Sequence, residues 1–273
     1  MDDLESLALE IREADCVVAL TGAGISAPSG IPTFRGDDGV WEHFEEGQFT
    51  YGRFQRDPAG FWQDRLELQR ALYGSSYEPN AAHEALARLG RAGHLEAIIT
   101  QNTDGLHERA AGADADGTDG QTHDETREDE LPDATEATIL ELHGNAHRVV
   151  CDACGYTTAA DPVFDGVADG DVPPRCDCGG CYRPDVVLFG QQLPKPVLQR
   201  ARSLARASDV FLAIGSSLVV EPAASLPRTA VRSGATLAIV NLEETPVDRD
   251  ASVVRRADVT ADVPRLADLL EAA

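Results

Sequence analysis

Lysine is almost absent from this chain of 273 residues: Lys195 is the only one, and arginine carries the remaining positive charge. Lys and Arg together number 23 against 47 Asp and Glu, which gives a formal net charge of -24 at pH 7. Binding to a phosphate backbone needs Lys and Arg to displace counterions, so this balance argues against direct nucleic-acid binding. An acidic, lysine-poor surface is typical of a protein kept soluble in high salt, where charge repulsion is screened. The alternative interpretation is an acidic cytosolic protein from a cell that is not adapted to high salt.

Long hydrophobic runs are also missing. No apolar stretch approaches the ~20 residues that a membrane-spanning helix needs. The amino-terminal Met-Asp-Asp-Leu-Glu is acidic, whereas a secretory signal begins with a basic region. We therefore expect a cytoplasmic protein that does not bind membranes.

Short apolar runs alternate with helical patterns along much of the chain. The first run, 16–20, leads directly into glycines, as a buried parallel strand does before a phosphate-binding turn. The alternation predicts an α/β fold, a Rossmann-like parallel sheet covered by helices on both faces. Further runs lie at 97–100, 210–214 and 237–240, and helical patterns at 4–14, 81–89, 195–207, 223–233 and about 263–272.

The six cysteines are unevenly placed. Cys16 stands alone in an apolar run, and the other five lie within residues 151–181. Two neighbouring cysteine pairs in a loop-rich insert favour a structural zinc site over disulfides or a redox dithiol. That segment lacks helical or strand periodicity for most of its length and needs a metal to hold it together. The candidate ligands are Cys151, Cys154, Cys176, Cys178 and Cys181, and their spacing leaves open which one is spare.

A glycine turn follows the first apolar run. Gly22-Ala23-Gly24, closed by Ala27, satisfies the Gly-x-Gly-x-x-(Gly/Ala) pattern of dinucleotide-binding turns, in which the next helix N-terminus faces a pyrophosphate. The acidic residue expected about twenty positions further on has no clear counterpart. A glycine turn of some other nucleotide-binding fold is therefore an equally good interpretation.

The stretch 30–36, Gly-Ile-Pro-Thr-Phe-Arg-Gly, suggests a loop that closes over a cofactor. There Arg35 could meet a phosphate, and Phe34 could shield a reactive centre from water. The alternative is a surface loop with an arginine lying along it.

Polar side chains gather where the run at 97–100 ends. In open parallel sheets, ligands bind outside the carboxyl ends of the strands, so Gln101, Asn102 and Asp104 could hold a ribose or an amide. The same residues could instead cap a helix. His143 follows the short apolar run 139–142, and a histidine can move a proton near neutral pH. A lone histidine is more often structural, but this one lies between two other candidate sites.

Taken in order, these motifs resemble those of the sirtuin family, the NAD-dependent protein deacylases, and the resemblance covers nearly the whole chain. The matching stretches are 22–26, 30–36, 100–107, 142–145, the cysteine pairs, 183–190, 215–218 with 222–224, and Asn241. The resemblance implies NAD as a co-substrate, a structural Zn2+ and acetyl-lysine proteins or peptides as substrates.

The resemblance also implies roles for single residues. His143 would be the general base, with Asn102 and Asp104 beside it at the nicotinamide ribose. A substrate peptide would add as a strand between two segments of the chain, and the residues implied there are Val187, Phe189, Gly190 and Val219. The residues implied to bind NAD are Gly22, Ala23, Gly24, Phe34, Arg35, Gln101, Asn102, Asp104, Gly215, Ser216, Ser217, Asn241 and Glu243.

The implied reaction moves an acyl group from lysine to ADP-ribose and releases nicotinamide. The alternatives are protein ADP-ribosyl transfer, which shares the first step, and an NAD-sensing zinc protein without turnover. Because the residues implied at the reacting sugar are all present, the third reading is disfavoured.

The chain departs from the family pattern at several positions. Thr103 replaces a usual isoleucine, for which we expect a change in packing only, and Gln191 stands where a glutamate is common. Desuccinylase-like members carry Tyr-x-x-Arg where this chain has Arg65 and Leu68, so plain deacetylation is the better prediction. The family pattern favours Cys151, Cys154, Cys176 and Cys178 as zinc ligands, with Cys181 as the alternative to Cys176.

The expected division of the chain follows from these motifs. Residues 1–35, 80–145 and 185–273 would form the discontinuous Rossmann-like NAD-binding domain, and 36–79 a helical segment next to the cofactor loop. Residues 146–184 would form an inserted zinc-binding module, and 113–135 an acidic mobile insertion.

Overall fold

The computed structural model of the chain describes residues 2–33, 39–112 and 136–272. Phe34 and Arg35, together with the predicted insertion at 113–135, lie outside the described residues. No helix among the described residues is long and apolar enough to cross a membrane.

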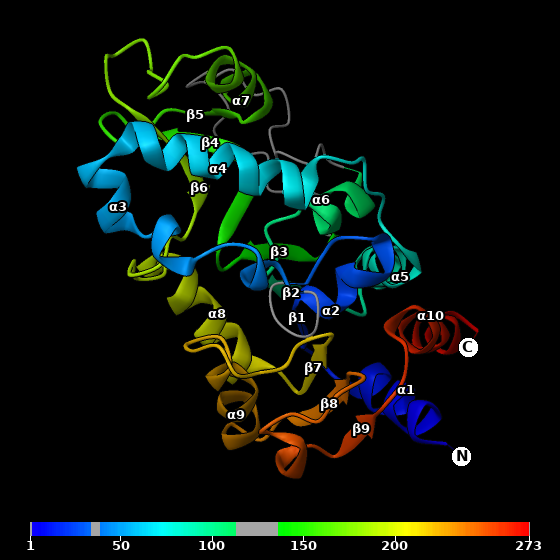
Figure 1. The fold of residues 1–273 in the computed structure, drawn as a ribbon. Helices are drawn as coiled ribbons and strands as arrows, with labels where there is room; N and C mark the ends of the chain where they lie inside the picture. The colour runs from blue at the N-terminus through cyan, green and yellow to red at the C-terminus, as the bar shows by residue number, and fades with distance from the viewer. Residues whose placement is uncertain (1, 34–38, 113–135, 273) are drawn as a thin grey trace, which may run out of the picture.

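A parallel sheet forms the centre of the larger part of the molecule (Figure 1). Its strand order is β3-β2-β1-β7-β8-β9, and all five neighbouring pairs run parallel. The predicted α/β class is therefore confirmed. The strands are β1 (Val17–Thr21), β2 (Ala97–Thr100), β3 (Thr138–Glu141), β7 (Val210–Ile214), β8 (Thr236–Val240) and β9 (Val253–Arg255).

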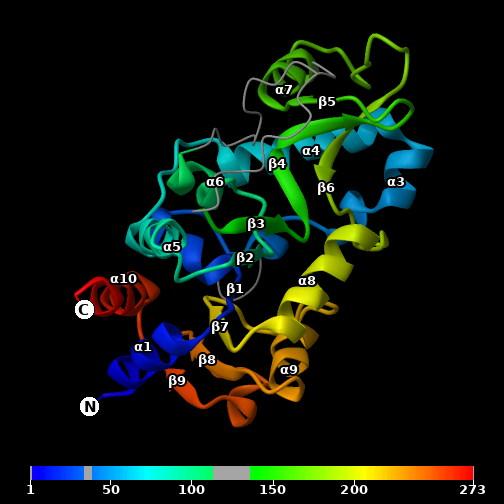
Figure 2. The same cartoon turned by 180° about the vertical axis from the view of Figure 1, so that it is seen from behind.

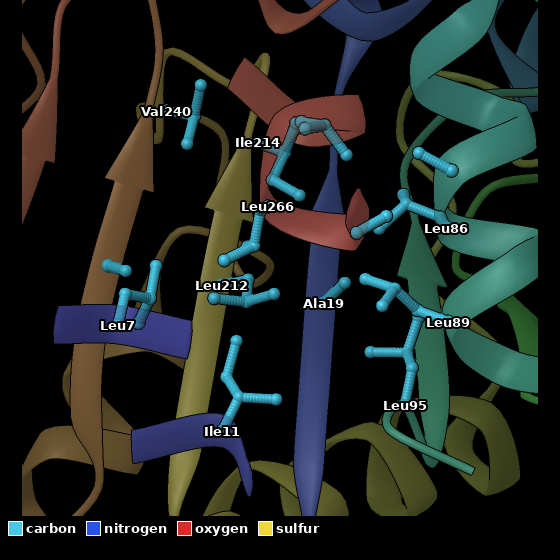
Figure 3. Close-up of a cluster of buried hydrophobic side chains, with 14 of the residues drawn as sticks. Leu7, Ile11, Ala19, Leu86, Leu89, Leu95, Leu212, Ile214, Val240 and Leu266 are labelled. Atoms are coloured by element: carbon cyan, nitrogen blue, oxygen red, sulfur yellow. The ribbon is translucent and has the colours of Figure 1, made fainter. Parts of the chain in front are cut away.

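Helices cover both faces of this sheet because successive strand residues point to opposite sides. In β1, Val17 and Ala19 join the core under α1, α5 and α10 (Figure 3), whereas Val18 and Leu20 join the core under α8 and α9. Helices α1 and α10 pack together, so the two termini lie close together (Figures 1 and 2). These helices are α1 (Asp3–Glu13), α5 (Ala81–Arg91), α8 (Lys195–Ala207), α9 (Ser225–Arg232) and α10 (Val259–Glu271).

The last helix begins earlier than predicted. Helix α10 starts at Val259 and includes Pro264, whereas the pattern placed the start at about Val263. Asp258 caps the true beginning by accepting hydrogen bonds from the N–H and hydroxyl of Thr260. Pro264 has no backbone N–H and so donates no hydrogen bond within the helix.

A second, smaller sheet has the antiparallel order β5-β4-β6 and lies beside α3, α4 and α7. Phe61 and Trp62 of α4 pack against Val149 of β4 and Phe164 of α7. Segment 151–181 therefore holds more regular structure than predicted, because Phe164 and Val167 give α7 a buried face. The elements are α3 (Tyr51–Arg56), α4 (Pro58–Tyr73), β4 (Gly144–Cys151), β5 (Thr157–Ala159), α7 (Asp161–Ala168) and β6 (Tyr182–Val186).

Short helical segments connect these elements. Two lie at the ends of strands β1 and β2, namely α2 (Ala23–Ser26) and α6 (Leu106–Ala111). The 3₁₀ turns are η1 (Ala27–Ser29), η2 (Val40–Glu42), η3 (Glu46–Phe49) and η4 (Asp248–Asp250).

Candidate active site

A cavity of about 1190 Å³ opens at the carboxyl edge of the parallel sheet. The turns that follow β1, β2, β7 and β8 line it, as do His143, the segment 186–193 and one face of α4. Predicted ligand-binding residues that follow four separate strands thus meet in one space. This is the edge at which open parallel sheets bind ligands.

The glycine turn after β1 packs against the turn after β7. Gly24 donates its N–H to the carbonyl of Gly215 at 2.8 Å, and a Cβ on Gly24 would lie 2.8 Å from the same oxygen. Only glycine permits this approach, which brings the two turns onto one wall of the cavity. The helix that follows the turn, α2, has four residues.

Side-chain amides join the strand ends across the floor of the cavity. Gln101 donates from Nε2 to the hydroxyl of Ser216 at 2.9 Å. Asn102 donates from Nδ2 to the carbonyl of Gly22 at 3.1 Å and to the hydroxyl of Ser26 at 2.9 Å. Both amides are therefore held in fixed orientations between β1, β2 and β7, and both line the cavity.

His143 is held by one ring nitrogen and lines the cavity. Its Nδ1 lies 2.9 Å from the carbonyl oxygen of Gln101. A carbonyl can only accept, so Nδ1 carries the proton and Nε2 is the nitrogen that can take up another. Burial lowers the pKa of His143, and the hydrogen bond to Gln101 offsets part of this shift. The imidazole is therefore neutral at pH 7 and able to act as a base.

Asp104 does not line the cavity, unlike Asn102 and His143. Its Oδ1 accepts the N–H of Leu106 at 3.0 Å and so caps α6. Burial raises the pKa of Asp104, and hydrogen bonds from Leu106 and Ser26 counter that shift. The Ser26 hydroxyl also accepts a hydrogen bond from Nδ2 of Asn102, and Asn102 lines the cavity, so Asp104 is linked to the cavity through these two residues.

The far end of the cavity is lined by Ser216, Ser217, Asn241 and Glu243. Asn241 lies at the carboxyl end of β8 and donates from Nδ2 to the carbonyl of Glu243 at 2.9 Å, which holds this turn. Ala23 and Gly215, also predicted as ligand-binding residues, line the cavity as well.

The segment predicted to bind a peptide lies along one wall. Val187, Phe189 and Gly190 line the cavity, whereas Val219 is 56% exposed and does not. The N–H of Val187 donates to the carbonyl of His143 at 2.9 Å, and that of Phe189 donates to the carbonyl of Phe49 at 3.2 Å. These contacts tie the wall to the histidine and to residues 49–51.

Four cysteine sulfurs form a cluster in the smaller part of the molecule. Cys151, Cys154, Cys176 and Cys178 place their Sγ atoms within 4.8 Å of one another. This donor set suits a closed tetrahedral zinc site. Cys181 lies outside the cluster and donates its thiol to the carbonyl of Tyr182. A Cβ on Gly180 would lie 2.6 Å from the Cys151 sulfur, so a glycine lets the chain pass this close.

Some cavity residues were not among the predicted site residues. Arg65, Leu68 and Leu72 come from α4, and their helical spacing was the available signal. Thr103 was expected to change packing only, yet it lines the cavity and its hydroxyl lies 3.0 Å from that of Tyr73. Thr103 therefore makes a polar contact in addition to packing.

Comparison with known proteins gives one consistent family. A model described as the Sir2 family matches residues 22–123 and 129–222. An NAD-dependent protein deacetylase of Haloarcula marismortui is 51% identical over 98% of this chain and 95% of its own length. One of Sulfurisphaera tokodaii is 40% identical over 93% of this chain and 90% of its own. A solved Sir2 structure with a p53 peptide and NAD+ has a TM-score of 0.79 and 34% identity, covering 100% of both chains.

Proposed function

The chain belongs to the Sir2 family and is an NAD-dependent protein-lysine deacetylase, and we propose that the cavity at the sheet edge is its active site. The observation that carries this proposal is the convergence of His143, Asn102 and Gln101 with the turns after β1, β7 and β8. The reaction transfers the acetyl group of a lysine side chain to ADP-ribose and releases nicotinamide.

The residues present fit NAD. The cavity of about 1190 Å³ runs from His143 to Asn241, with the glycine turn between them. We propose that Gly22, Ala23 and Gly24 face the pyrophosphate, since small residues there leave backbone N–H groups accessible. The other proposed NAD contacts are Phe34, Arg35, Gln101, Asn102, Asp104, Gly215, Ser216, Ser217, Asn241 and Glu243.

NAD supplies a ribose carbon from which nicotinamide can leave. The task of His143 is to accept a proton at Nε2 from a hydroxyl of that sugar. Burial lowers the pKa of His143 from its ordinary value of 6.5, so the imidazole is neutral at pH 7 and can take up this proton. Asn102 orients the sugar through an amide held by Gly22 and Ser26, and Asp104 positions Ser26 from behind.

The substrate is an acetyl-lysine protein or peptide. We propose that its backbone lies along Val187, Phe189 and Gly190, with Val219 on the opposite side. The N–H groups of Val187 and Phe189 already donate within the chain, so the peptide must rely on other backbone groups of these segments.

We propose that the four clustered cysteines hold zinc as a structural ion. Four sulfur ligands leave no open position for a substrate, and the cluster belongs to the segment of the smaller sheet. The division of the chain into an NAD-binding domain (1–35, 80–145, 185–273), a helical segment (36–79), a zinc module (146–184) and an insertion (113–135) stays a proposal.

We further propose a cytoplasmic protein adapted to high salt, with no direct nucleic-acid binding. The excess of acidic residues, the single lysine and the similarity to a Haloarcula deacetylase support this proposal.

Mass spectrometry of an acetyl-lysine peptide incubated with NAD and the protein tests the function. We expect deacetylated peptide, nicotinamide and acetylated ADP-ribose in equal amounts. A peptide that gains ADP-ribose would indicate ADP-ribosyl transfer, and unchanged NAD would indicate sensing without turnover. His143→Ala should abolish deacetylation while NAD still binds, whereas His43→Ala, at an exposed position, should not. Full activity of the His143→Ala variant would show that His143 is not the general base.

A further inference from the structure

The single lysine of the chain lies at the edge of the active-site cavity. Lys195 is exposed, begins α8 and lines the cavity, as does the segment 186–193 just before it. No ion pair within the part of the chain that the structure describes includes Lys195, whereas Arg228, for example, pairs with Asp250 at 3.2 Å. In a chain with 47 acidic residues, this ammonium is therefore free to meet a negative charge that a substrate brings.

Two neutral amides stand between the proposed peptide wall and Lys195. Gln191 follows Gly190, at a position where a glutamate is common in the family, and Gln192 comes next; both line the cavity. The N–H of Leu188 donates to Oε1 of Gln191 at 2.8 Å, and the N–H of Gln191 donates to the carbonyl of Leu188 at 3.0 Å. A carboxylate would accept the first of these bonds equally well. The turn itself therefore does not require an amide, but the amide leaves this edge of the cavity without a negative charge.

The acidic residues that do line the cavity lie elsewhere along it. Glu243 is at the far end beside Asn241, and Glu221 belongs to the same segment as Val219, on the other side of the proposed peptide path. No ion pair joins Glu221 to Lys195. One edge of the proposed peptide path thus carries a cation and the opposite edge carries an anion.

We infer that this deacetylase selects acetyl-lysine segments that carry an Asp or Glu close to the acetyl-lysine, with that carboxylate paired to Lys195. The inference rests on the proposed function, since it names the substrate class of the same site. Main-chain hydrogen bonds of an added strand give affinity, and side-chain contacts give specificity. The lysine ammonium is a flexible point charge with three donors, so it suits a carboxylate that approaches from more than one direction.

The test uses acetyl-lysine peptides with otherwise uncharged flanks. A single Asp is placed in turn at each of the three positions on either side of the acetyl-lysine, and a matched peptide carries Asn at the same position. Asp and Asn have nearly the same size, so the ratio of their kcat/KM values for nicotinamide release isolates the charge. The assay runs at the lowest KCl concentration at which circular dichroism shows every variant to be folded, because salt screens exposed ion pairs.

Four variants separate Lys195 from the charge of the whole protein. Lys195→Gln removes the charge and Lys195→Glu reverses it, whereas Gln191→Glu adds a carboxylate and keeps the lysine. Arg206→Glu is the matched control, because Arg206 is exposed on the same helix, does not line the cavity, and changes the net charge as Lys195→Glu does.

We expect the wild type to prefer Asp over Asn by roughly 2–5-fold at one or more positions, mainly through KM, which is the effect of an exposed ion pair. Lys195→Gln should lose this preference, Lys195→Glu should prefer Asn, and Gln191→Glu should weaken the preference. Arg206→Glu should keep it. Added KCl should reduce the wild-type preference.

Three results would overturn the inference alone. They are a wild-type ratio near one at every position, a preference that Lys195→Gln retains, and a preference that Arg206→Glu loses as fully as Lys195→Glu does. Failure of the wild type to consume NAD with any of the peptides would instead reject the proposed function, and the inference with it.

Discussion

Gly144, the residue after the proposed base, offers a sharp test of how the site is built. Its φ of +77° is in the left-handed region, and a Cβ there would lie 2.0 Å from the carbonyl oxygen of Asp185. Real Cβ atoms essentially never come closer than 3.0 Å, so Gly144→Ala must push β4 and β6 apart by about 1 Å. The neighbouring His143 shares this junction, because its carbonyl accepts the N–H of Val187.

We expect Gly144→Ala to lower kcat by roughly 100-fold, the loss typical of a ~1 Å misplacement of a catalytic group. NAD binding should weaken far less, since the turns after β1, β7 and β8 are remote from the clash. The substitution also adds a left-handed strain of about 1–2 kcal/mol. The assay is nicotinamide release from an acetyl-lysine peptide, together with thermal unfolding.

Gly93→Ala is the matched control for that strain. Gly93 has φ of +76°, yet a Cβ there meets nothing within 4 Å, and the residue lies after α5, away from the cavity. The Gly93→Ala variant should lose the same ~1–2 kcal/mol of unfolding free energy, while its kcat stays unchanged. If Gly144→Ala remains folded and loses no more activity than Gly93→Ala, the argument that this junction positions His143 is wrong.

Two further predictions concern metal and salt. Cys151→Ser should reduce the zinc content below one equivalent and unfold the smaller sheet, whereas Cys181→Ser should keep one equivalent of zinc. Metal analysis and circular dichroism measure the two effects. The reverse pattern would reject the proposed ligand set. Raising KCl from about 0.1 M to 2 M should raise the unfolding temperature, because salt shortens the range of repulsion between the acidic side chains from about 10 Å to about 3 Å or less. An unfolding temperature that does not rise would reject the proposed adaptation to high salt.

Local patterns predicted the parallel sheet well. The strands at 97–100 and 210–214 and the helix at 195–207 have the predicted bounds, because each is a continuous apolar run or an amphipathic stretch with clear ends. Strand β4 and helix α7 received no such assignment, and helix α4 lies in the segment 36–79, which was expected to be helical without bounds for single helices. Their apolar residues are interrupted by polar ones and become buried only when Trp62, Val149 and Phe164 meet.

The sequence by itself determined the chemistry that is available: a glycine turn, an amide pair, a histidine and five clustered cysteines, each in a motif whose local spacing limits what it can do. Only the tertiary structure decided how these groups are used. It set Asp104 behind Ser26, left Cys181 out of the sulfur cluster and buried Arg65 in the wall of the cavity, where its Nε and Nη1 have no hydrogen-bond partner among the described residues. The physical reason is that burial and pairing depend on residues far apart in the chain, and they decide whether a polar group is structural or awaits a ligand.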